Sequence, residues 1–190
     1  MRRLALLLCA TAMAVSVVGG QGLQGAQTAR GATPAAALPI IVLETVKGTI
    51  EVQLFPNDAP KSVAHIIALV NKSFYRAQRF HRAEASLVQF GDPQSRDMTR
   101  MNSWGTGSSY NRIGVAEISK RKHVRGAVGL AHSGNATLAD SQLYIMKAAS
   151  PSLDGKHAIV GQVISGMAVV DKLAKGDQIR LATMKGAGAK

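Results

Sequence analysis

Two segments that lie far apart in the chain carry the side chains best suited to chemistry. The first runs from Arg79-Phe80-His81-Arg82 to Gln89-Phe90-Gly91-Asp92-Pro93, and the second joins Ser141-Gln142-Leu143-Tyr144-Ile145 to Leu153-Asp154-Gly155-Lys156-His157. The first offers a guanidinium beside an extended run, and the second offers apolar side chains with amide and imidazole hydrogen-bonding groups. A guanidinium fixed over an apolar slot can donate a charge-assisted hydrogen bond worth about 1.5 to 3 kcal/mol. Such chemistry needs no nucleophile.

Together the two segments resemble the cyclophilin family of peptidyl-prolyl cis-trans isomerases, and the resemblance covers residues 40–184. It implies that the protein accelerates rotation about X–Pro bonds, which meets a barrier of about 20 kcal/mol because amide resonance must be broken. The arginine of the family's Phe-His-Arg motif is its catalytic cation, and Arg82 occupies that place. The positions that the resemblance assigns to substrate binding are Leu87, Val88, Gln89, Ala131, His132, Gln142, Tyr144, Leu153 and His157.

The stretch between Arg82 and Gln89 is one residue shorter than the usual family pattern. The family's aromatic residue and its apolar neighbour therefore map onto Leu87 and Val88, or onto Ser86 and Leu87. The same shortening motivates an alternative function, a catalytically weak chaperone or scaffold that binds proline-containing segments. Without the resemblance, Arg82 would be interpreted as a surface ion-pair partner of a nearby carboxylate, such as that of Glu84 or Asp92.

The elements that must position these residues are mostly short strands. Alternating β-branched residues predict a hairpin over residues 40–54. Further short strands are predicted over residues 87–90, 127–131, 142–146 and 158–164. Helical spacing of apolar residues predicts helices over 59–71, with Asp58 as the N-cap, and over 167–175. Many short strands and few helices indicate a closed or nearly closed antiparallel barrel. With the resemblance, the expected fold is mainly β, a cyclophilin-like closed eight-stranded antiparallel β-barrel capped by two α-helices.

The beginning of the chain has the layout of a secretory signal peptide, because a basic start is followed by an apolar run and then by small and polar residues. We expect a signal peptide over residues 1–29 with an uncertain cleavage site, an Ala/Pro-rich linker over 30–39, the isomerase domain over 40–184 and a flexible tail over 185–190. If the first segment is not cleaved, it would tether the domain to a membrane. The only cysteine, Cys9, lies in this segment. The prediction is an exported protein of the periplasm or cell envelope of a bacterium.

The formal net charge of +12 favours contact with anionic surfaces. Only 4% of the residues are aromatic, so there is little on which bases could stack, and we expect no nucleic-acid partner. No two histidines have metal-ligand spacing, and we expect neither a metal nor a cofactor. His65 and His123 are interpreted as solvent-facing. The expected partners are proline-containing unfolded or flexible polypeptides, and the family norm implies a monomer. The predicted function is X–Pro isomerisation in folding or flexible polypeptides of the cell envelope.

Overall fold

The computed structural model describes residues 37–186, and the structural statements below concern this range. The signal peptide expected over residues 1–29 lies outside it, as do residues 30–36 of the expected linker and residues 187–190 of the expected tail. The predicted domain boundaries therefore stay predictions. Within the described range, no helix combines the length and the apolar character that a membrane crossing requires.

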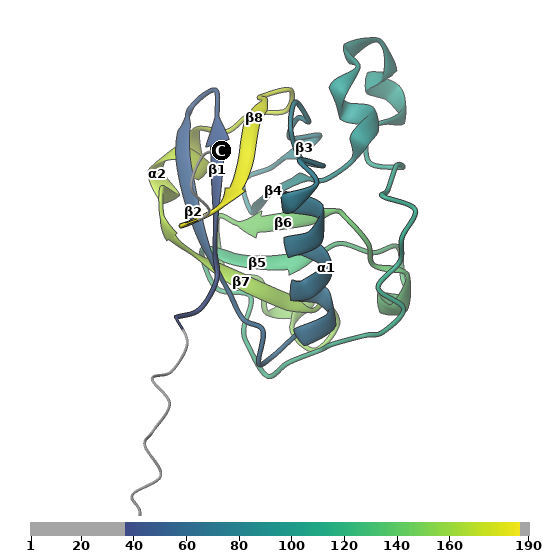
Figure 1. The fold of residues 1–190 in the computed structure, drawn as a ribbon, viewed down its shortest axis with the longest axis vertical. Helices are drawn as coiled ribbons and strands as arrows, with labels where there is room; N and C mark the ends of the chain where they lie inside the picture. The colour runs from purple at the N-terminus through teal and green to yellow at the C-terminus, as the bar shows by residue number, and fades with distance from the viewer. Residues whose placement is uncertain (1–36, 187–190) are drawn as a thin grey trace, which may run out of the picture. The chain divides into compact units, whose positions relative to one another are not determined.

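Eight strands form one antiparallel sheet that curls around a hydrophobic core (Figure 1). Their order in the sheet is β3-β4-β6-β5-β7-β2-β1-β8. The strands are β1 (Ile40–Thr45), β2 (Gly48–Leu54), β3 (Arg82–Ala83), β4 (Leu87–Phe90), β5 (Ala127–Leu130), β6 (Leu143–Met146), β7 (Ile159–Ser165) and β8 (Ile179–Met184). The four short strands predicted after the first hairpin are confirmed to within one residue at each end. The hydrophobic pattern does not locate β3, which is only two residues long, or β8.

The first two strands confirm the predicted hairpin. Ile40 pairs with Gln53 and Thr45 pairs with Gly48, which leaves Val46-Lys47 as a two-residue connection. Side chains alternate between the two faces of a strand, so the apolar residues at every second position of both strands are buried in the core.

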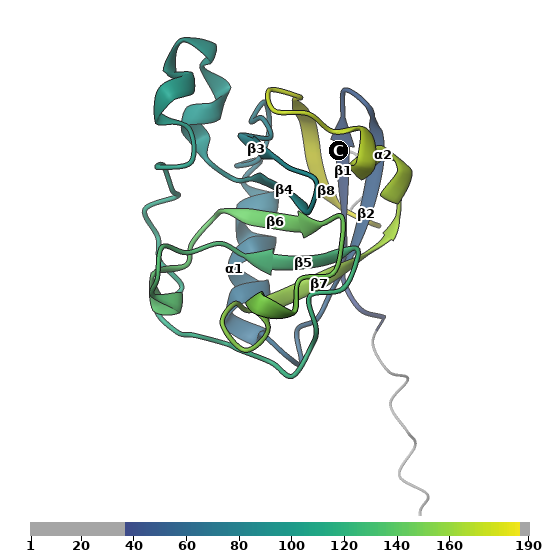
Figure 2. The ribbon, with the colours of Figure 1, turned by 180° about the vertical axis from the view of Figure 1, so that it is seen from behind.

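Helix α1 (Pro60–Asn71) lies across one side of strands β4 to β7 (Figure 1), and these strands lie in front of it when the molecule is seen from behind (Figure 2). The buried residues on its inner face are Ser62, Val63, Ile66, Leu69 and Val70. The helix therefore covers the concave side of the sheet and closes the main core.

The predicted N-cap of this helix, Asp58, is wrong, because the cap is the following alanine and makes no side-chain hydrogen bond. The Asp58 carboxylate instead accepts a hydrogen bond of 2.8 Å from Nε of Arg121. The free amides of Lys61 and Ser62 donate to the two carboxylate oxygens of Glu117, at 3.0 and 2.7 Å. Glu117, a distant residue, thus accepts the hydrogen bonds of the free N-terminal amides that an N-cap side chain would otherwise accept.

Helix α2 (Met167–Lys172) is shorter than the predicted 167–175 because Leu173 adopts an extended backbone, with φ −68° and ψ 134°. Its N-cap, Gly166, has a positive φ of 89°. A Cβ at this position would lie 2.4 Å from the backbone oxygen of Thr49. The helix therefore begins at a position that only glycine can fill without displacing β2.

The prediction of a closed barrel is wrong. The sheet is a curled half-barrel whose edge strands, β3 and β8, share no ladder of hydrogen bonds. The chain that leads into β3 meets the start of β8 through a bridge between Arg79 and Gln178 and through backbone hydrogen bonds of 2.8 to 2.9 Å. β3 itself is only two residues long, so the residues that lie next to β8 belong to the irregular chain before β3 and form no ladder with it.

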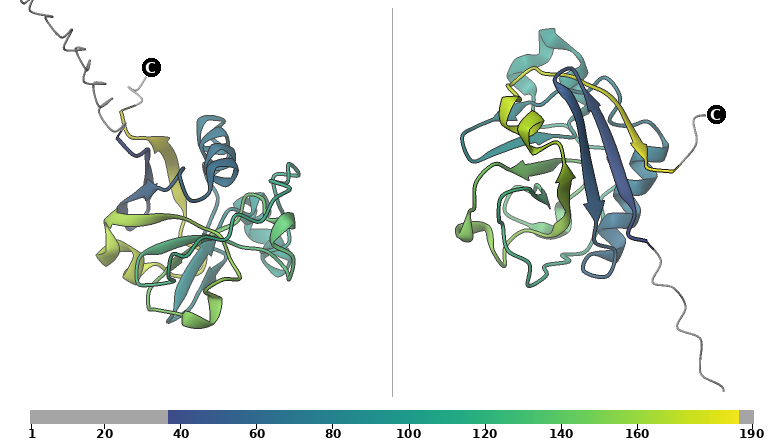
Figure 3. Two further views of the ribbon diagram at one scale, coloured as in Figure 1. Left: turned by 90° about the horizontal axis from the view of Figure 1, so that it is seen from below. Right: turned by 90° about the vertical axis from the view of Figure 1, so that its left-hand side faces the viewer.

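The sheet has an apolar layer on each face. The main core fills the side that α1 covers. A second, smaller cluster lies on the other face of the same strands and consists of Phe55, Leu87, Ala127, Tyr144, Met146 and Ile159. Along β6, for example, Leu143 and Ile145 belong to the main core while Tyr144 and Met146 belong to the second cluster. Two further views of the fold show α2 packed beside β2 (Figure 3).

Candidate active site

The segment that carries Arg82 is a tight hairpin between β3 and β4. Arg82 pairs with Gln89, and the backbone amide of Glu84 donates to the carbonyl of Leu87 at 2.8 Å. Only Ala85-Ser86 remain as the connection. Because side chains alternate along a strand, the side chains of Arg82, Glu84, Leu87 and Gln89 lie on one face of the hairpin. The missing residue in this stretch is thus accommodated by a two-residue turn.

Val88 does not lie on this face, and its assignment to substrate binding is wrong. It is 0% exposed and belongs to the main core beneath the sheet, whereas Leu87 belongs to the second cluster on the outer face. Of the two alignments left open by the sequence, the burial supports the one that uses Ser86 and Leu87. Within β4 the side chains of Leu87 and Val88 point to opposite faces of the sheet, whereas Ser86 lies in the turn before the strand and is not bound by this alternation.

Arg82 is held by hydrogen bonds to two side chains. Its Nε donates to Oε1 of Glu84 at 2.6 Å and its Nη2 donates to Oε2 of Glu84 at 2.9 Å. Its Nη1 lies 3.5 Å from Oε1 of Gln89. The ion pair with Glu84 agrees with one of the alternatives drawn from the sequence. The side chain of Arg82 is still 49% exposed, so it is accessible to a bound polypeptide.

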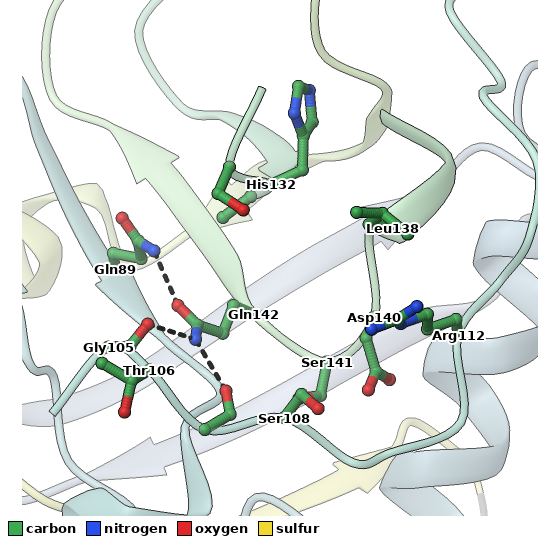
Figure 4. Close-up of a pocket in the computed structure, with 13 residues that line it drawn as sticks. Gln89, Gly105, Thr106, Ser108, Arg112, His132, Leu138, Asp140, Ser141 and Gln142 are labelled. Carbon is green, nitrogen blue, oxygen red and sulfur yellow. Dashed lines mark hydrogen bonds between the residues drawn. The ribbon is translucent and has the colours of Figure 1, made fainter. Parts of the chain in front are cut away.

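Hydrogen bonds continue from Arg82 into a groove. Gln89 Nε2 donates to Oε1 of Gln142 at 2.9 Å, and Gln142 Nε2 donates to the carbonyl oxygens of Gly105 and Gly107 at 2.9 and 2.8 Å (Figure 4). The two predicted glutamines are therefore in direct contact, although one lies in β4 and the other directly precedes β6. The two glycine carbonyls that fix Gln142 belong to the irregular segment between β4 and β5, and no sequence pattern indicated them.

The groove next to these residues has a volume of about 520 Å³. The residues that line it are Gln89, Gly105, Thr106, Gly107, Ser108, Arg112, Ala131, His132, Ser133, Leu138, Asp140, Ser141 and Gln142. Four predicted site residues, Gln89, Ala131, His132 and Gln142, are thus brought together. Figure 4 shows the side chains of the two glutamines on the left, those of Arg112 and Leu138 on the right, and His132 at the top between them. Arg82 borders this groove through Gln89 and is not part of its lining.

The predicted proline-binding residues form an apolar surface next to the groove. Leu87 and Tyr144 belong to the second cluster and Leu153 packs against it. The ring of His157 stacks on that of His132 with centroids 4.1 Å apart and meets the Tyr144 ring edge-on at 5.8 Å. The imidazole therefore connects the groove to the apolar surface. Leu87 is 7% exposed and Tyr144 3% exposed, so this surface is shallow.

A buried hydrogen-bond chain supports Tyr144 from behind. Its hydroxyl lies 2.8 Å from Nε2 of His123, whose Nδ1 lies 2.9 Å from Oδ1 of Asp154. The prediction that His123 faces solvent is wrong, because its side chain is 0% exposed. His65 is also largely buried and lies 2.9 Å from Oδ1 of Asp140. The partners that bury both imidazoles come from distant segments, which a charge pattern along the chain does not reveal.

The surroundings of these groups change their pKa values. Burial raises the pKa of the Tyr144 hydroxyl, and the charge of Asp154 raises it further. Hydrogen bonds from the backbone amide and then from the imidazole of His123 lower the pKa of the Asp154 carboxyl. Burial lowers the pKa of His157, although a hydrogen bond to the carbonyl of Leu130 opposes this change. At neutral pH the apolar surface is therefore bordered by an uncharged Tyr144 and an uncharged His157.

We expect the free energy of unfolding to fall as the pH is lowered from 7.5 to 5, partly because of His157. Its folded-state pKa lies below the ordinary value of 6.5. In the interval between these two values the unfolded chain binds more protons, so acidification favours unfolding. Denaturant titrations at several pH values should show a smaller pH dependence in His157→Gln than in the parent protein. Equal pH dependence in both would contradict this account.

Among residues 37–186, no group of three or more His, Cys, Asp or Glu side chains could hold a metal ion. The arrangement instead offers a guanidinium, a line of amides and an apolar surface. These groups can bind an extended polypeptide by hydrogen bonds and accommodate a compact apolar ring beside a positive charge.

Comparison with known proteins decides which family this arrangement belongs to. The sequence profile described as "Cyclophilin type peptidyl-prolyl cis-trans isomerase/CLD" matches residues 40–186. The chain belongs to the cyclophilin-type peptidyl-prolyl cis-trans isomerase family. A "Probable peptidyl-prolyl cis-trans isomerase" of Brucella suis is 36% identical over 182 residues, which cover 92% of this cyclophilin and 90% of the relative. A peptidyl-prolyl cis-trans isomerase of Helicobacter pylori is 36% identical over 142 residues, 72% of this chain and 81% of the relative.

Solved structures show the same fold. A crystal structure of a cyclophilin type peptidyl-prolyl cis-trans isomerase from Cryptosporidium parvum has a TM-score of 0.68 and 23% identity, and the match covers 80% of this cyclophilin and 99% of that chain. A second structure of the Cryptosporidium parvum protein, solved in the presence of the dipeptide Ala-Pro, has a TM-score of 0.67 and 22% identity over 77% of this chain and 99% of that chain. The predictions of an enzyme and of its class, a peptidyl-prolyl cis-trans isomerase, are confirmed.

Proposed function

We propose that this cyclophilin isomerises X–Pro bonds in folding or flexible polypeptides of the cell envelope, with Arg82 as the catalytic cation. The proline ring lies against Leu87, Tyr144, Leu153 and His157, and the flanking chain runs along Gln89, Ala131, His132 and Gln142. The observation that carries the proposal is the continuous line of hydrogen bonds from Arg82 through Gln89 to Gln142, which joins the cation to the groove. This line of contacts supports a site in which a cation borders the groove that would bind the peptide.

The mechanism follows from the electronic change in the amide. When an X–Pro bond twists, resonance is lost and the nitrogen lone pair becomes available to a donor. A guanidinium close to the proline nitrogen can then donate a hydrogen bond that the planar amide cannot accept, so Arg82 stabilises the transition state more than either ground state. A charge-assisted hydrogen bond contributes about 1.5 to 3 kcal/mol. Turnover in milliseconds requires a reduction of roughly 5 to 7 kcal/mol from a process that takes tens of seconds.

The remaining reduction comes from the groove and the apolar surface. The glutamine amides and the backbone at Ala131 and His132 hold the chain on one side of the bond, while the apolar surface holds the ring and excludes water from the amide. Because Leu87 and Tyr144 are almost fully buried, the ring is accommodated on a shallow surface. No covalent intermediate is needed, which agrees with a site built from amides, a guanidinium and apolar groups.

Exchange spectroscopy on an Ala-Pro-containing peptide tests the activity directly. Catalytic amounts of the protein should broaden and merge the cis and trans resonances of the peptide. A chaperone or scaffold that binds proline-containing segments would shift the resonances without speeding the exchange. That second function is favoured by the shallow apolar surface, and it becomes the better description if binding occurs with no change in the exchange rate.

Leu87 and Val88 should differ in their effects on substrate binding. Val88→Ala should lower the free energy of unfolding by about 2 kcal/mol, because it removes two buried methyl groups from the main core. It should leave KM unchanged. Leu87→Ala removes part of the apolar surface and should raise KM severalfold. Both variants are assayed well below their melting temperatures. A raised KM in Val88→Ala alone would contradict the assignment of the two faces.

The location and assembly of the protein are part of the proposal. The basic and apolar start of the chain supports export to the periplasm or cell envelope of a bacterium, and the compact domain supports a monomer. Fractionation of cells that produce the full chain, with N-terminal sequencing of the product, tests both cleavage and location. A full-length product in the cytoplasmic fraction would contradict export, and a full-length product in the membrane fraction would support the tether.

A further inference from the structure

We propose that Glu84 is a positioning residue for Arg82, whose carboxylate holds one edge of the guanidinium so that Nη1 is directed toward Gln89 and the groove. The inference rests on the proposed function, because Glu84 gains this role only if Arg82 is the catalytic cation. Glu84 lies in the shortened stretch of the chain, outside the motifs that indicated the site.

The tight hairpin is what places Glu84 beside Arg82. The two residues are two positions apart along β3 and its extension, so their side chains emerge on the same face. The two-residue turn at Ala85-Ser86 keeps Glu84 paired with Leu87 through a backbone hydrogen bond of 2.8 Å. The carboxylate is therefore carried by a short, paired backbone and not by a free loop.

The contact between the two side chains is bidentate. Nε and Nη2 of Arg82 donate to separate oxygens of Glu84 at 2.6 and 2.9 Å, which is the fork geometry that arginine and carboxylate prefer. This contact occupies one edge of the planar guanidinium. The nitrogen left over is Nη1, which lies 3.5 Å from the Gln89 side chain. The orientation of the plane is thus set by Glu84, and its free edge faces the groove.

The free edge is part of a chain of contacts that ends at backbone. Gln89 donates to Gln142, which donates to the carbonyls of Gly105 and Gly107. Glu84 lies at one end of this series and the two glycine carbonyls lie at the other. Arg82, Gln89 and Gln142 between them each have a hydrogen-bond partner on both sides. Removing Glu84 would free the arginine end of this series, while the glutamine end would keep its backbone anchors.

Stability alone does not explain this pair. Both side chains are about half exposed, at 49% and 47%, and exposed ion pairs contribute little to folding. The charge of Glu84 also opposes the positive charge that Arg82 offers to the substrate, but solvent screens this effect at an exposed site. A fixed orientation is therefore the contribution that the pair can make. Arginine otherwise explores many rotamers, and fixing it in advance lowers the entropic cost in the transition state.

The chain contains a matched control for the experiment. Arg125 and Asp171 form a second bidentate pair, with hydrogen bonds of 2.9 and 2.7 Å and side chains that are 50% and 43% exposed. Neither residue lines the groove. Asp171→Ala removes a carboxylate from a pair of the same kind and exposure at a place with no role in the proposed chemistry.

The test compares Glu84→Ala, Glu84→Gln, Asp171→Ala and Arg82→Ala in the full-length protein on one X–Pro peptide. Glu84→Ala should lower kcat about three- to fivefold, the upper range for an exposed ion pair, and should change KM less than twofold. Glu84→Gln, which keeps a single acceptor, should lie between Glu84→Ala and the parent. Asp171→Ala should match the parent. The Nε–H cross-peak of Arg82, assigned by its loss in Arg82→Ala, should exchange with water faster in Glu84→Ala.

The outcomes separate this inference from the proposed function. Unchanged or increased kcat in Glu84→Ala, together with a strong loss in Arg82→Ala, would overturn the positioning role and leave the catalytic arginine in place. Full activity in Arg82→Ala would overturn the proposed function itself. An equal loss in Asp171→Ala would show a general effect of charge, and it too would overturn the role of Glu84. Thermal unfolding of each variant checks that all four proteins are folded.

Discussion

Arg82→Ala is expected to lower turnover of an X–Pro peptide at least tenfold, and by up to about 150-fold, while the thermal unfolding transition stays within a degree or two of the parent. The range corresponds to the loss of one charge-assisted hydrogen bond, about 1.5 to 3 kcal/mol. The effect falls on kcat because the bond forms only when the amide is twisted. Stability is hardly affected, since Arg82 is half exposed and its ion pair contributes little.

Arg82→Lys is the matched variant for this prediction. It keeps the positive charge but loses the planar fork that contacts Glu84 and Gln89 together. We therefore expect a loss of turnover close to that of Arg82→Ala. Line-shape analysis of the cis and trans peptide resonances measures both variants. If Arg82→Lys retained full activity, charge alone would be sufficient and the geometric argument would fail. If Arg82→Ala retained it, the catalytic role of Arg82 would be disproved.

His123→Leu is expected to lower the free energy of unfolding by about 2 to 3 kcal/mol. The imidazole is completely buried between Tyr144 and Asp154. Leucine has a similar volume but leaves the Tyr144 hydroxyl without a partner in an apolar cluster, and an unsatisfied buried polar group costs about 1 to 3 kcal/mol. For a domain of this size the melting temperature should fall by roughly 5 to 10 °C. Calorimetry measures the change.

A double-mutant cycle with Tyr144→Phe provides the control. Phenylalanine removes the hydroxyl, so the combination of Tyr144→Phe and His123→Leu leaves no unpaired group between the two positions. The double variant should therefore be more stable than the sum of the single effects predicts. Additive effects would show that the hydrogen bond between His123 and Tyr144 contributes nothing. Tyr144→Phe should retain most of the isomerase activity, because the aromatic ring that forms part of the apolar surface is unchanged.

The local elements of this cyclophilin were predictable because their signals are local. The hairpin over residues 40–54 follows from alternating apolar residues, and strand β4 was located to the residue. Helix α1 was predicted correctly over all but its first residue, since its apolar spacing has the helical period. The capping residue was not predicted, because Glu117, which binds the first free amides, is 55 positions away from Ser62.

The site could be predicted in part, and the errors have a common cause. The resemblance named Gln89 and Gln142, and the structure places them in contact. It could not tell which apolar residue of β4 faces the same side as Gln89, because a single missing residue before the strand shifts the alignment by one position. A shift of one position exchanges the two faces of the strand. Val88 was therefore assigned to the site although it lies in the core.

What the sequence determined by itself is the family and the order of the short strands along the chain, and it predicted that Arg82, Gln89 and Gln142 belong to one site. The tertiary structure alone decided that the sheet stays open between β3 and β8, that His123 is buried under Tyr144, and that Glu84 holds Arg82. The physical reason is the distance along the chain over which the deciding interactions act. Strand and helix patterns depend on residues a few positions apart, whereas closure, burial and the partners of a charged group depend on segments that only folding brings together.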